Sequence, residues 1–186
     1  MNTTEQALAD ITALFEQQGG ADYYGEPVSQ LAHALQCAHL AESADADNDT
    51  VVAALLHDIG HLLPGGALMA NYGRLDHERG GADFLRRRGF SEKVAQLIEH
   101  HVDAKRYLTH KHPAYAAALS EASRQTLAFQ GGPMTPEEAR RFEQHPFFAE
   151  ILQVRRWDEA AKRPGWRTPE LAHYLARCRA HLSRHP

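Results

Sequence analysis

Apolar residues recur along this chain at intervals of three and four positions, the spacing of one face of an α-helix. In the first segment Leu8, Ile11 and Phe15 follow this spacing. The pair Gly19-Gly20 then ends the predicted helix. No stretch alternates apolar and polar residues with the two-residue period of a strand between hairpin turns. The pattern therefore predicts an all-α protein.

The most apolar segment of the chain is VVAALLHDIGH, which begins at Val51. A helix that starts near Pro27 and runs toward Leu40 precedes it, because proline suits a first helical turn. Asp49 or Thr50 is expected to cap the apolar helix, and Pro64 to end it. Since this helix is apolar on nearly all faces, we expect it to be the buried central helix.

The second half of the chain reads as a succession of short helices. One is expected to open at His77 and stop at Gly89, and the next to start at Ser91 and run to His101. Further helices are predicted over 105–108, 115–128, 136–144, 146–162 and 169–182. The clearest break is Gly131-Gly132-Pro133, and no internal repeat or low-complexity linker is present. Residues 1–186 are therefore predicted to form a single helical domain.

Composition is that of an ordinary globular protein, with 43% apolar and 24% charged residues among 186. The net charge of -4 and a short basic run at Arg86-Arg87-Arg88, which is typical of a solvated helix face, give no support for a nucleic-acid partner. No segment is apolar over the length that a membrane span needs. Cys37 and Cys178 lie far apart without CxxC spacing, which indicates reduced thiols and a cytoplasmic location.

The chain contains 13 histidines, more than packing or solubility requires. His57-Asp58 lies within the apolar helix, where an unpaired carboxylate is costly to bury. A local hydrogen-bonded pair would be the simplest explanation if this dipeptide stood alone. Imidazole and carboxylate ligands together suit zinc, iron, manganese and similar ions. The further candidate ligands are His33, His77, His101 and Asp158, so the set is sufficient for two metals that Asp58 can bridge.

The order His33, His57-Asp58, Asp158, with His77 and His101 between them, resembles the HD-domain metalloproteins over most of the chain. The resemblance implies a helical bundle with a central metal site. Most HD-domain proteins are phosphohydrolases, and a small branch consists of mixed-valence di-iron oxygenases. His61, four residues after His57, is expected to line the same pocket without necessarily binding metal.

The segment YYGEPVSQLAH, with Tyr23 and Glu26 ahead of His33, resembles the phosphonate-cleaving oxygenases of that branch. The resemblance implies that Tyr23 and Glu26 cover the iron site and recognise an amino or trimethylammonium group. It places the phosphonate-binding residues at His61, Lys105, Ser123, Thr126 and Arg155. Catalytic roles are expected for Tyr23, His61 and Lys105. His101 is preferred to His100 as a ligand because its spacing to Lys105 fits the family.

In the family's terms, Asp58 bridges an Fe(II)/Fe(III) pair. One iron takes His33, His57, Asp58 and Asp158, and the other takes Asp58, His77 and His101. The implied reaction uses dioxygen to cleave the carbon–phosphorus bond of a 1-hydroxy-2-(amino or trimethylammonio)ethylphosphonate, giving phosphate and glycine or glycine betaine. A 2-oxoglutarate-dependent hydroxylase would supply this substrate.

Three alternatives compete with this interpretation. A metal-dependent phosphohydrolase of a nucleotide or small phosphate ester would use the same ligands to activate water, and it is the commoner activity in the superfamily. Inositol-ring cleavage is disfavoured because the chain is short. A regulatory module with an inactive site ranks lowest because no ligand is missing. The remaining histidines are interpreted as surface or local structural residues: His39, His100, His110, His112, His145, His173, His181 and His185.

Overall fold

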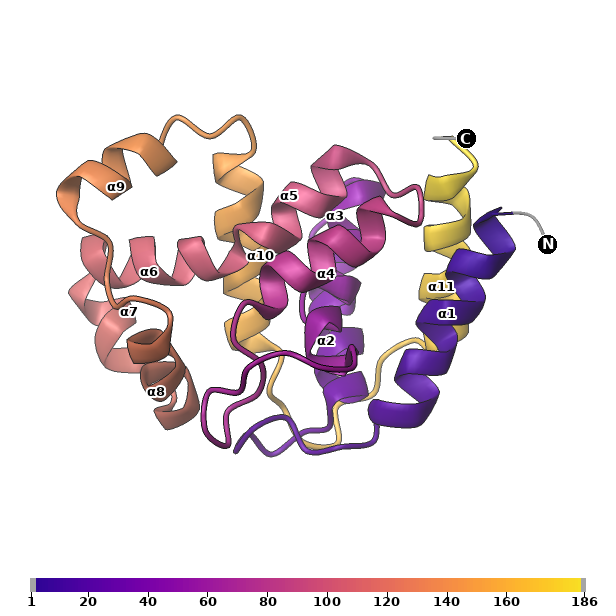
Figure 1. Cartoon of the computed structure of the whole chain (residues 1–186), viewed down its shortest axis with the longest axis horizontal. Coiled ribbons are helices and arrows are strands. Elements are labelled where there is room, and N and C mark those ends of the chain that lie inside the picture. The colour runs from indigo at the N-terminus through magenta and orange to yellow at the C-terminus, as the bar shows by residue number, and fades with distance from the viewer. Residues whose placement is uncertain (1–2, 185–186) are drawn as a thin grey trace.

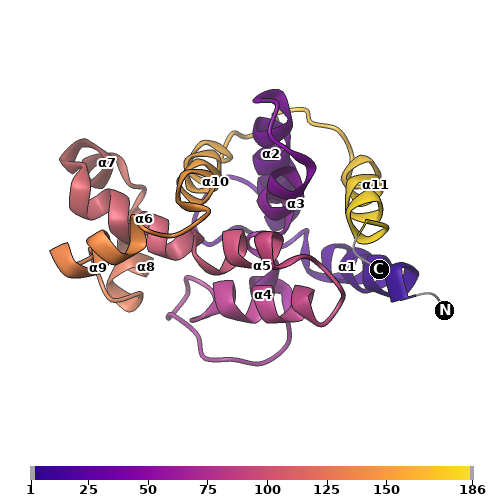
Figure 2. The same ribbon diagram turned by 90° about the horizontal axis from the view of Figure 1, so that it is seen from above.

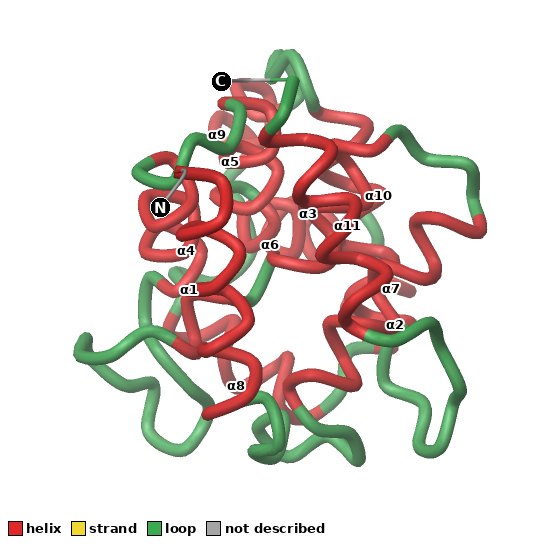
Figure 3. The backbone as a smooth tube through the Cα atoms, turned by 90° about the vertical axis from the view of Figure 1, so that its right-hand side faces the viewer, coloured by secondary structure: helices red, strands yellow, loops and turns green. Residues whose placement is uncertain are grey.

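The regular structure of the chain is helical throughout the part described by the computed structural model, residues 3–184 (Figure 3). The elements are α1 (Thr3–Gln18), α2 (Gln30–Ser43), α3 (Asn48–Leu56), the 3-10 helix η1 (Ile59–Leu62), α4 (His77–Arg86), α5 (Glu92–Glu99), α6 (His101–Lys111), α7 (Pro113–Ala118), α8 (Glu121–Phe129), α9 (Pro136–Phe142), α10 (Phe148–Ala160) and α11 (Leu171–Leu182). The predicted all-α class is confirmed.

Helix α3 lies at the centre of the fold. Every residue from Thr50 to Leu56 is buried, as its apolar sequence predicts. It packs against α2, α5, α10 and α11. Figure 2 shows α10, α2 and α11 along one side of the molecule, with α4 and α5 on the other. The apolar side chains of these helices form one core.

The two ends of the molecule differ in what they contain. Helices α1 and α11, the first and last helices of the described residues, pack against each other at one end of the molecule (Figure 1). Helices α6 to α9 form the opposite end, and α10 connects them to the core because it contacts both α6 and α2. The metal-ligand candidates therefore lie where α10 joins these two parts.

Capping side chains fix where the helices begin. Ser91 caps α5 as predicted, through a hydrogen bond that its side chain accepts from Val94 N. The expected start near Pro27 is wrong, since Ser29 caps α2 by accepting from Ala32 N. The expected cap at Asp49 or Thr50 is also wrong, because the side chain of Asp47 accepts from Thr50 N. Each error moves a boundary by only a few residues.

The central helix does not continue through the histidine–aspartate pair, contrary to expectation. Helix α3 ends at Leu56, and the chain resumes as the 3-10 helix η1 at Ile59. A Cβ atom at Gly60 would lie 1.9 Å from the carbonyl oxygen of His77, so the backbones of η1 and α4 touch here. His57 and Asp58 consequently occupy the junction between two helices.

In the second half of the chain, the helices predicted over 136–144, 146–162 and 169–182 are present with slightly different ends, but the region before them was predicted less well. The stretch 115–128 forms two helices, because the side chain of Ser120 caps α8 by accepting from Ser123 N. Helix α5 ends at Glu99 rather than reaching His101, which is the first residue of α6. Helix α6 is also much longer than the predicted 105–108. The break at Gly131-Gly132-Pro133 is present as predicted.

The basic run of α4 is largely paired. Arg86 donates to Glu92 and Glu99, and Arg88 contacts Asp10 on α1. Within residues 3–184 no helix combines the length and apolar character needed to cross a membrane. Cys37 and Cys178 are both buried free cysteines.

Candidate metal centre and substrate pocket

Four buried histidines converge from separate helices. His33 lies on α2, His57 follows α3, His77 begins α4 and His101 begins α6. The Nδ1 atom of each ring lies within hydrogen-bond distance of a backbone carbonyl oxygen. These Nδ1 contacts are His33 to Ala161 at 2.9 Å, His57 to Ala54 at 2.8 Å, His77 to Arg74 at 3.1 Å and His101 to Ile98 at 2.7 Å. Because a carbonyl oxygen only accepts, each Nδ1 carries the proton and leaves its Nε2 lone pair free.

The free nitrogens face each other in pairs. His33 Nε2 lies 3.1 Å from His57 Nε2, and His77 Nε2 lies 3.2 Å from His101 Nε2. Two imidazole lone pairs at this separation repel each other unless a metal ion or a proton lies between them. This arrangement fits metal binding, in which neutral imidazoles present Nε2 to an ion while Nδ1–H donates to the backbone.

Asp58 directs one carboxylate oxygen toward each histidine pair. Its Oδ1 lies 3.3 Å from His77 Nε2 and 3.4 Å from His101 Nε2. Its Oδ2 lies 3.4 Å from His57 Nε2 and 3.7 Å from His33 Nε2. Burial alone would raise the pKa of Asp58, but the neighbouring imidazoles of His57, His101 and His77 hold it well below its usual range. This is the geometry of a bridging carboxylate.

Asp158 completes the first of the two groups. Its Oδ1 lies 3.4 Å from His33 Nε2, and its Oδ2 accepts a hydrogen bond from Arg155 Nη1 at 2.5 Å. Burial would raise the pKa of Asp158, but Arg155 and His33 keep it well below its usual range. Within residues 3–184, two groups of ligand atoms are close enough to hold a metal ion each: His33, His57 and Asp58, and Asp58, His77 and His101.

The structure distinguishes His101 from its neighbour. His101 is buried with its ring in the cluster, whereas His100 Nδ1 lies 2.8 Å from Asp103 Oδ2, with its ring beside His145. His181, another buried histidine, lies on α11, where its ring stacks on Phe90 and its Nδ1 is 2.9 Å from Asp49 Oδ1. His185 lies outside the described residues.

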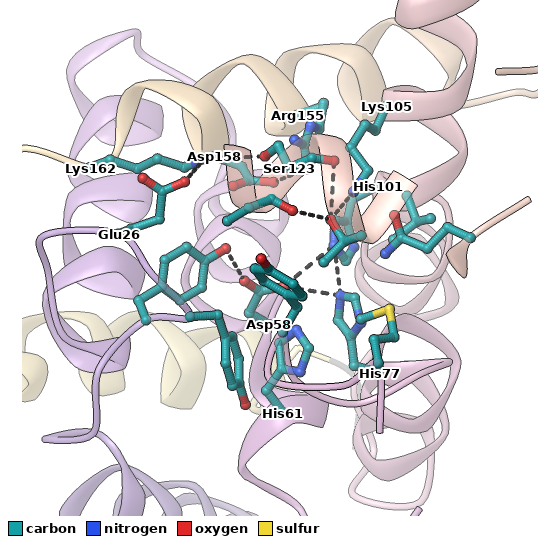
Figure 4. Close-up of a pocket in the computed structure, with 18 residues that line it drawn as sticks. Glu26, Asp58, His61, His77, His101, Lys105, Ser123, Arg155, Asp158 and Lys162 are labelled. Atoms are coloured by element: carbon teal, nitrogen blue, oxygen red, sulfur yellow. Dashed lines mark hydrogen bonds and ion pairs between the residues drawn. The ribbon is translucent and has the colours of Figure 1, made fainter. Parts of the chain in front are cut away.

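A cavity of about 50 Å³ opens directly over this cluster (Figure 4). It has room for several water-sized groups, since one water needs roughly 10–15 Å³ measured in this way. All the predicted substrate contacts line it, together with Asp58, His77, His101 and Asp158. Its other lining residues are Tyr24, Met69, Tyr72, Val102, Ala122, Gln130 and Lys162.

Tyr23 covers the first half of the cluster. Its hydroxyl donates to Asp58 Oδ2 at 2.7 Å, and its ring stacks on His33 with the centroids 3.9 Å apart. Burial, reinforced by Asp58 and Asp158, raises the pKa of Tyr23 well above its usual value. The phenol therefore stays protonated and acts as a hydrogen-bond donor toward the carboxylate of Asp58.

His61 stands beside the second half. Its ring stacks on His77 at 3.8 Å, and its Nδ1 accepts from the backbone N–H of Arg74 at 3.1 Å. Burial and the neighbouring His77 lower the pKa of His61 well below its usual value, so the ring is neutral and its proton is on Nε2. Gly73 permits this contact, because a Cβ there would lie 2.7 Å from His61 Cε1.

Cationic and hydroxyl groups form the wall contributed by α6, α8 and α10. Lys105 Nζ donates to Thr126 Oγ1 at 2.8 Å. Burial and the nearby Arg155 lower the pKa of Lys105 to about 7. Arg155 is itself buried and donates to Tyr115 Oη at 3.0 Å as well as to Asp158. The pocket thus has fixed donors beside the metal-ligand cluster, as anion binding requires.

Glu26 lies at another side of the pocket and already has a cationic neighbour. Ser120 Oγ donates to its Oε1 at 2.5 Å, and Lys162 Nζ donates to the same oxygen at 3.0 Å. Lys162 also lies 3.3 Å from Glu159 Oε2. The sequence analysis predicted Glu26 as a pocket residue but not Lys162, which lies just beyond the end of α10, four residues after Asp158.

Comparison with known proteins identifies what the chain is similar to. A family model described as HD domain matches residues 31–141. This match includes His33, His57, Asp58, His77 and His101, and it ends before α10.

Three relatives extend the similarity over most of the chain. An uncharacterised protein of Acanthamoeba polyphaga mimivirus is 42% identical over 167 residues, which are 87% of this chain and 76% of the relative. A [1-hydroxy-2-(trimethylamino)ethyl]phosphonate dioxygenase (glycine-betaine-forming) of Leisingera caerulea is 38% identical over 94% of this chain and 90% of its own. A hydroxymethylphosphonate dioxygenase of Gimesia maris is 43% identical over 88% of this chain and 84% of its own.

Proposed function

The chain belongs to the HD-domain family, and we propose that it is a dioxygen-dependent enzyme that cleaves the carbon–phosphorus bond of a 1-hydroxyphosphonate. The observation that carries this proposal is the pocket in which buried Lys105 and Arg155 adjoin two groups of metal-ligand atoms. The names of the two dioxygenase relatives support the same chemistry. For a 1-hydroxy-2-aminoethylphosphonate the products would be phosphate and glycine, and for its trimethylammonio analogue, phosphate and glycine betaine.

We propose iron at both positions. His33, His57, Asp58 and Asp158 would hold one ion, while Asp58, His77 and His101 would hold the other. An Fe(II)/Fe(III) pair supplies, when bound, the activation of dioxygen and the removal of hydrogen from C1. The backbone carbonyls at each Nδ1 keep the four imidazoles in the tautomer that such binding needs.

The phosphonate group would bind against the wall formed by α6, α8 and α10. Lys105 and Arg155 contribute positive charge, and the hydroxyls of Ser123 and Thr126 line the same wall. Neutral His61 offers its Nε2–H from the opposite side, since Arg74 occupies Nδ1. These groups orient the head group so that C1 lies above the metal-ligand cluster.

Tyr23 and Glu26 would contact the rest of the substrate. Tyr23 holds a proton on its hydroxyl beside Asp58 and shields this part of the pocket from water. Glu26 offers Oε2 to an ammonium group, because its Oε1 is already engaged by Ser120 and Lys162. The face of the Tyr24 ring could contact a trimethylammonium group, which cannot donate hydrogen bonds.

The hydroxyl on C1 must be installed before this reaction. We therefore propose that the substrate is supplied by an enzyme that hydroxylates a phosphonate at C1, such as a 2-oxoglutarate-dependent hydroxylase. A small-molecule phosphonate and dioxygen are then the reactants.

Dioxygen dependence tests the proposal against its main alternative. Purified protein loaded with iron should release phosphate from hydroxymethylphosphonate or 1-hydroxy-2-aminoethylphosphonate in air and not under strict anaerobiosis. A low-field mixed-valence signal in electron paramagnetic resonance should change when either compound is added. Equal turnover with and without dioxygen would instead assign the same residues to a phosphohydrolase that activates water.

A further inference from the structure

Lys162 is the cation of the pocket that the proposed phosphonate site does not use. Its side chain lies between two carboxylates, with Nζ 3.0 Å from Glu26 Oε1 and 3.3 Å from Glu159 Oε2. It also donates to Ser123 Oγ at 3.4 Å. Only 13% of the Lys162 side chain and 11% of the Glu26 side chain are exposed, so water screens this ion pair poorly.

The negative charge of Glu26 is offset by Lys162. Glu159 forms an ion pair with Arg155 as well as with Lys162, and Arg155 also pairs with Asp158. Arg155 is therefore shared among Asp158, Glu159 and the proposed phosphonate site, whereas Glu26 has Lys162 as its cationic partner. With Lys162 in place, Glu26 attracts an ammonium group less strongly than a carboxylate without a cationic partner would.

The position of Lys162 also separates it from the phosphonate wall. Figure 4 shows Lys162 and Glu26 together at one side of the pocket, with Lys105 and His101 at the other. Lys105 bonds to Thr126, whereas Lys162 bonds to Glu26. A substrate whose phosphonate lies against Lys105 would therefore place its far end near the Glu26–Lys162 pair.

We propose that Lys162 determines the substrate range, by neutralising Glu26 so that the pocket accepts 1-hydroxyphosphonates with an uncharged far end as well as aminated ones. This inference rests on the proposed function. An ammonium group that approaches Glu26 Oε2 meets attraction from Glu26 and repulsion from Lys162, which oppose each other. A substrate without a cation meets a carboxylate that is already paired, so it leaves no buried charge unsatisfied.

Removal of the Lys162 charge should therefore increase the affinity of the pocket for aminated substrates relative to uncharged ones. The experiment measures dissociation constants by titration calorimetry without dioxygen, using metal-loaded protein with 1-hydroxy-2-aminoethylphosphonate and with hydroxymethylphosphonate. In Lys162→Met, the ratio of the two affinities should shift toward the aminated compound by about tenfold or more, which corresponds to about 1.4 kcal/mol. Any general weakening of phosphonate binding cancels in this ratio.

Three further variants isolate the cause. Lys162→Gln keeps a hydrogen-bond donor for Glu26 without the charge and should shift the ratio in the same direction, which also covers the case that the methionine variant fails to fold. Lys162→Arg keeps the charge and should retain the original ratio. Lys111→Met removes a lysine from an exposed pair with Glu143 and should leave the ratio unchanged.

The double variant Lys162→Met/Glu26→Gln tests whether the gain passes through Glu26. It should lose the preference for the aminated compound that Lys162→Met gains, since no free carboxylate remains to attract the ammonium. An unchanged ratio in Lys162→Met and Lys162→Gln, or a shift toward hydroxymethylphosphonate, would overturn the role of Lys162 while leaving the proposed function intact. If the original protein binds neither phosphonate, the proposed function fails, and the Lys162 inference fails with it.

Discussion

At the scale of single residues, Asp58 is the side chain on which both halves of the metal centre depend. Each of its oxygens faces a different histidine pair, so Asp58→Ala removes a ligand from both. We expect the purified variant to lose both ions. Asp158→Ala, by contrast, should chiefly weaken the ion at His33 and His57, because Asp158 lies beside that pair. Elemental analysis distinguishes these outcomes, and full occupancy in Asp58→Ala would refute the bridging role.

Lys105 gives the pocket a pH dependence. Burial and Arg155 lower its pKa to about 7, so the side chain is an ammonium below that pH and a neutral amine above it. Because a phosphonate dianion binds the ammonium form, kcat/KM should fall as pH rises through about 7. Lys105→Arg keeps its charge at every accessible pH.

The substrate also titrates, but its titration affects the unsubstituted protein and Lys105→Arg equally. Comparing the two proteins therefore isolates the titration of Lys105. We suggest measuring kcat/KM of both proteins from about pH 6 to about pH 9. The value for the unsubstituted protein divided by the value for Lys105→Arg should decline as pH rises. A ratio that is constant over this range would show that Lys105 does not titrate in the reaction.

His57-Asp58 could be predicted from sequence because a carboxylate is rarely placed in an apolar segment without a compensating partner. The roles of His33, His77, His101 and Asp158 were implied by the resemblance to the HD-domain metalloproteins. The pairing of Glu26 with Lys162 could not be predicted, because it joins residues 136 positions apart. Nothing in the local sequence indicates which carboxylate a lysine will contact. The partners of Glu26 are therefore known only from the folded structure, in which Ser120 at the start of α8 and Lys162 after α10 lie beside it.

At the scale of elements, the most informative difference between prediction and structure is the junction between α3 and η1, which was predicted to be continuous helix. Periodicity predicted one helix through His57 and His61, since the residues themselves are compatible with a helix. Gly60 contacts the backbone of α4, which is distant in sequence, so the local hydrophobic pattern does not predict this contact. The same limitation explains the missed division at Ser120, whose hydroxyl both caps α8 and donates to Glu26.

Gly60 should consequently be intolerant of substitution. A methyl group in Gly60→Ala would lie 1.9 Å from the carbonyl oxygen of His77, so η1 and α4 must move apart. We expect a loss of about 1–3 kcal/mol in the free energy of unfolding, as for other overpacked sites. Because His77 begins α4, metal occupancy should fall as well.

Gly80 provides a matched control on α4, the helix that Gly60 contacts. It lies within α4, and a Cβ there would meet no atom within 4 Å. Gly80→Ala should therefore be neutral or stabilising by up to about 1 kcal/mol, because alanine favours the helix. Denaturant unfolding and elemental analysis of both variants test this contrast. Equal behaviour of Gly60→Ala and Gly80→Ala would show that the backbone contact is unimportant.

At the scale of the whole molecule, the metal centre joins parts of the chain that are distant in sequence. Its ligand candidates come from α2, the α3–η1 junction, α4, α6 and α10. The end formed by α6 to α9 meets the core at this centre, since α10 contacts both α6 and α2. Ions bound here would therefore hold the folded arrangement together in addition to any role in catalysis.

Removal of metal should lower the thermal stability of the entire chain. Without ions, the Nε2 atoms of two histidine pairs, 3.1 Å and 3.2 Å apart in a buried site, lose the ligand that links them, and the free energy of metal binding no longer stabilises the fold. A ligand at 100 times its dissociation constant stabilises a fold by about 2.7 kcal/mol, which for a chain of this size corresponds to a Tm change of about 5–10 °C. Calorimetry should show a decrease of at least this order after chelation, with recovery when iron is restored. Asp58→Ala, which lacks the bridge, should respond to neither treatment. An identical Tm for the chelated and the metal-loaded protein would contradict a stabilising role of the metal centre.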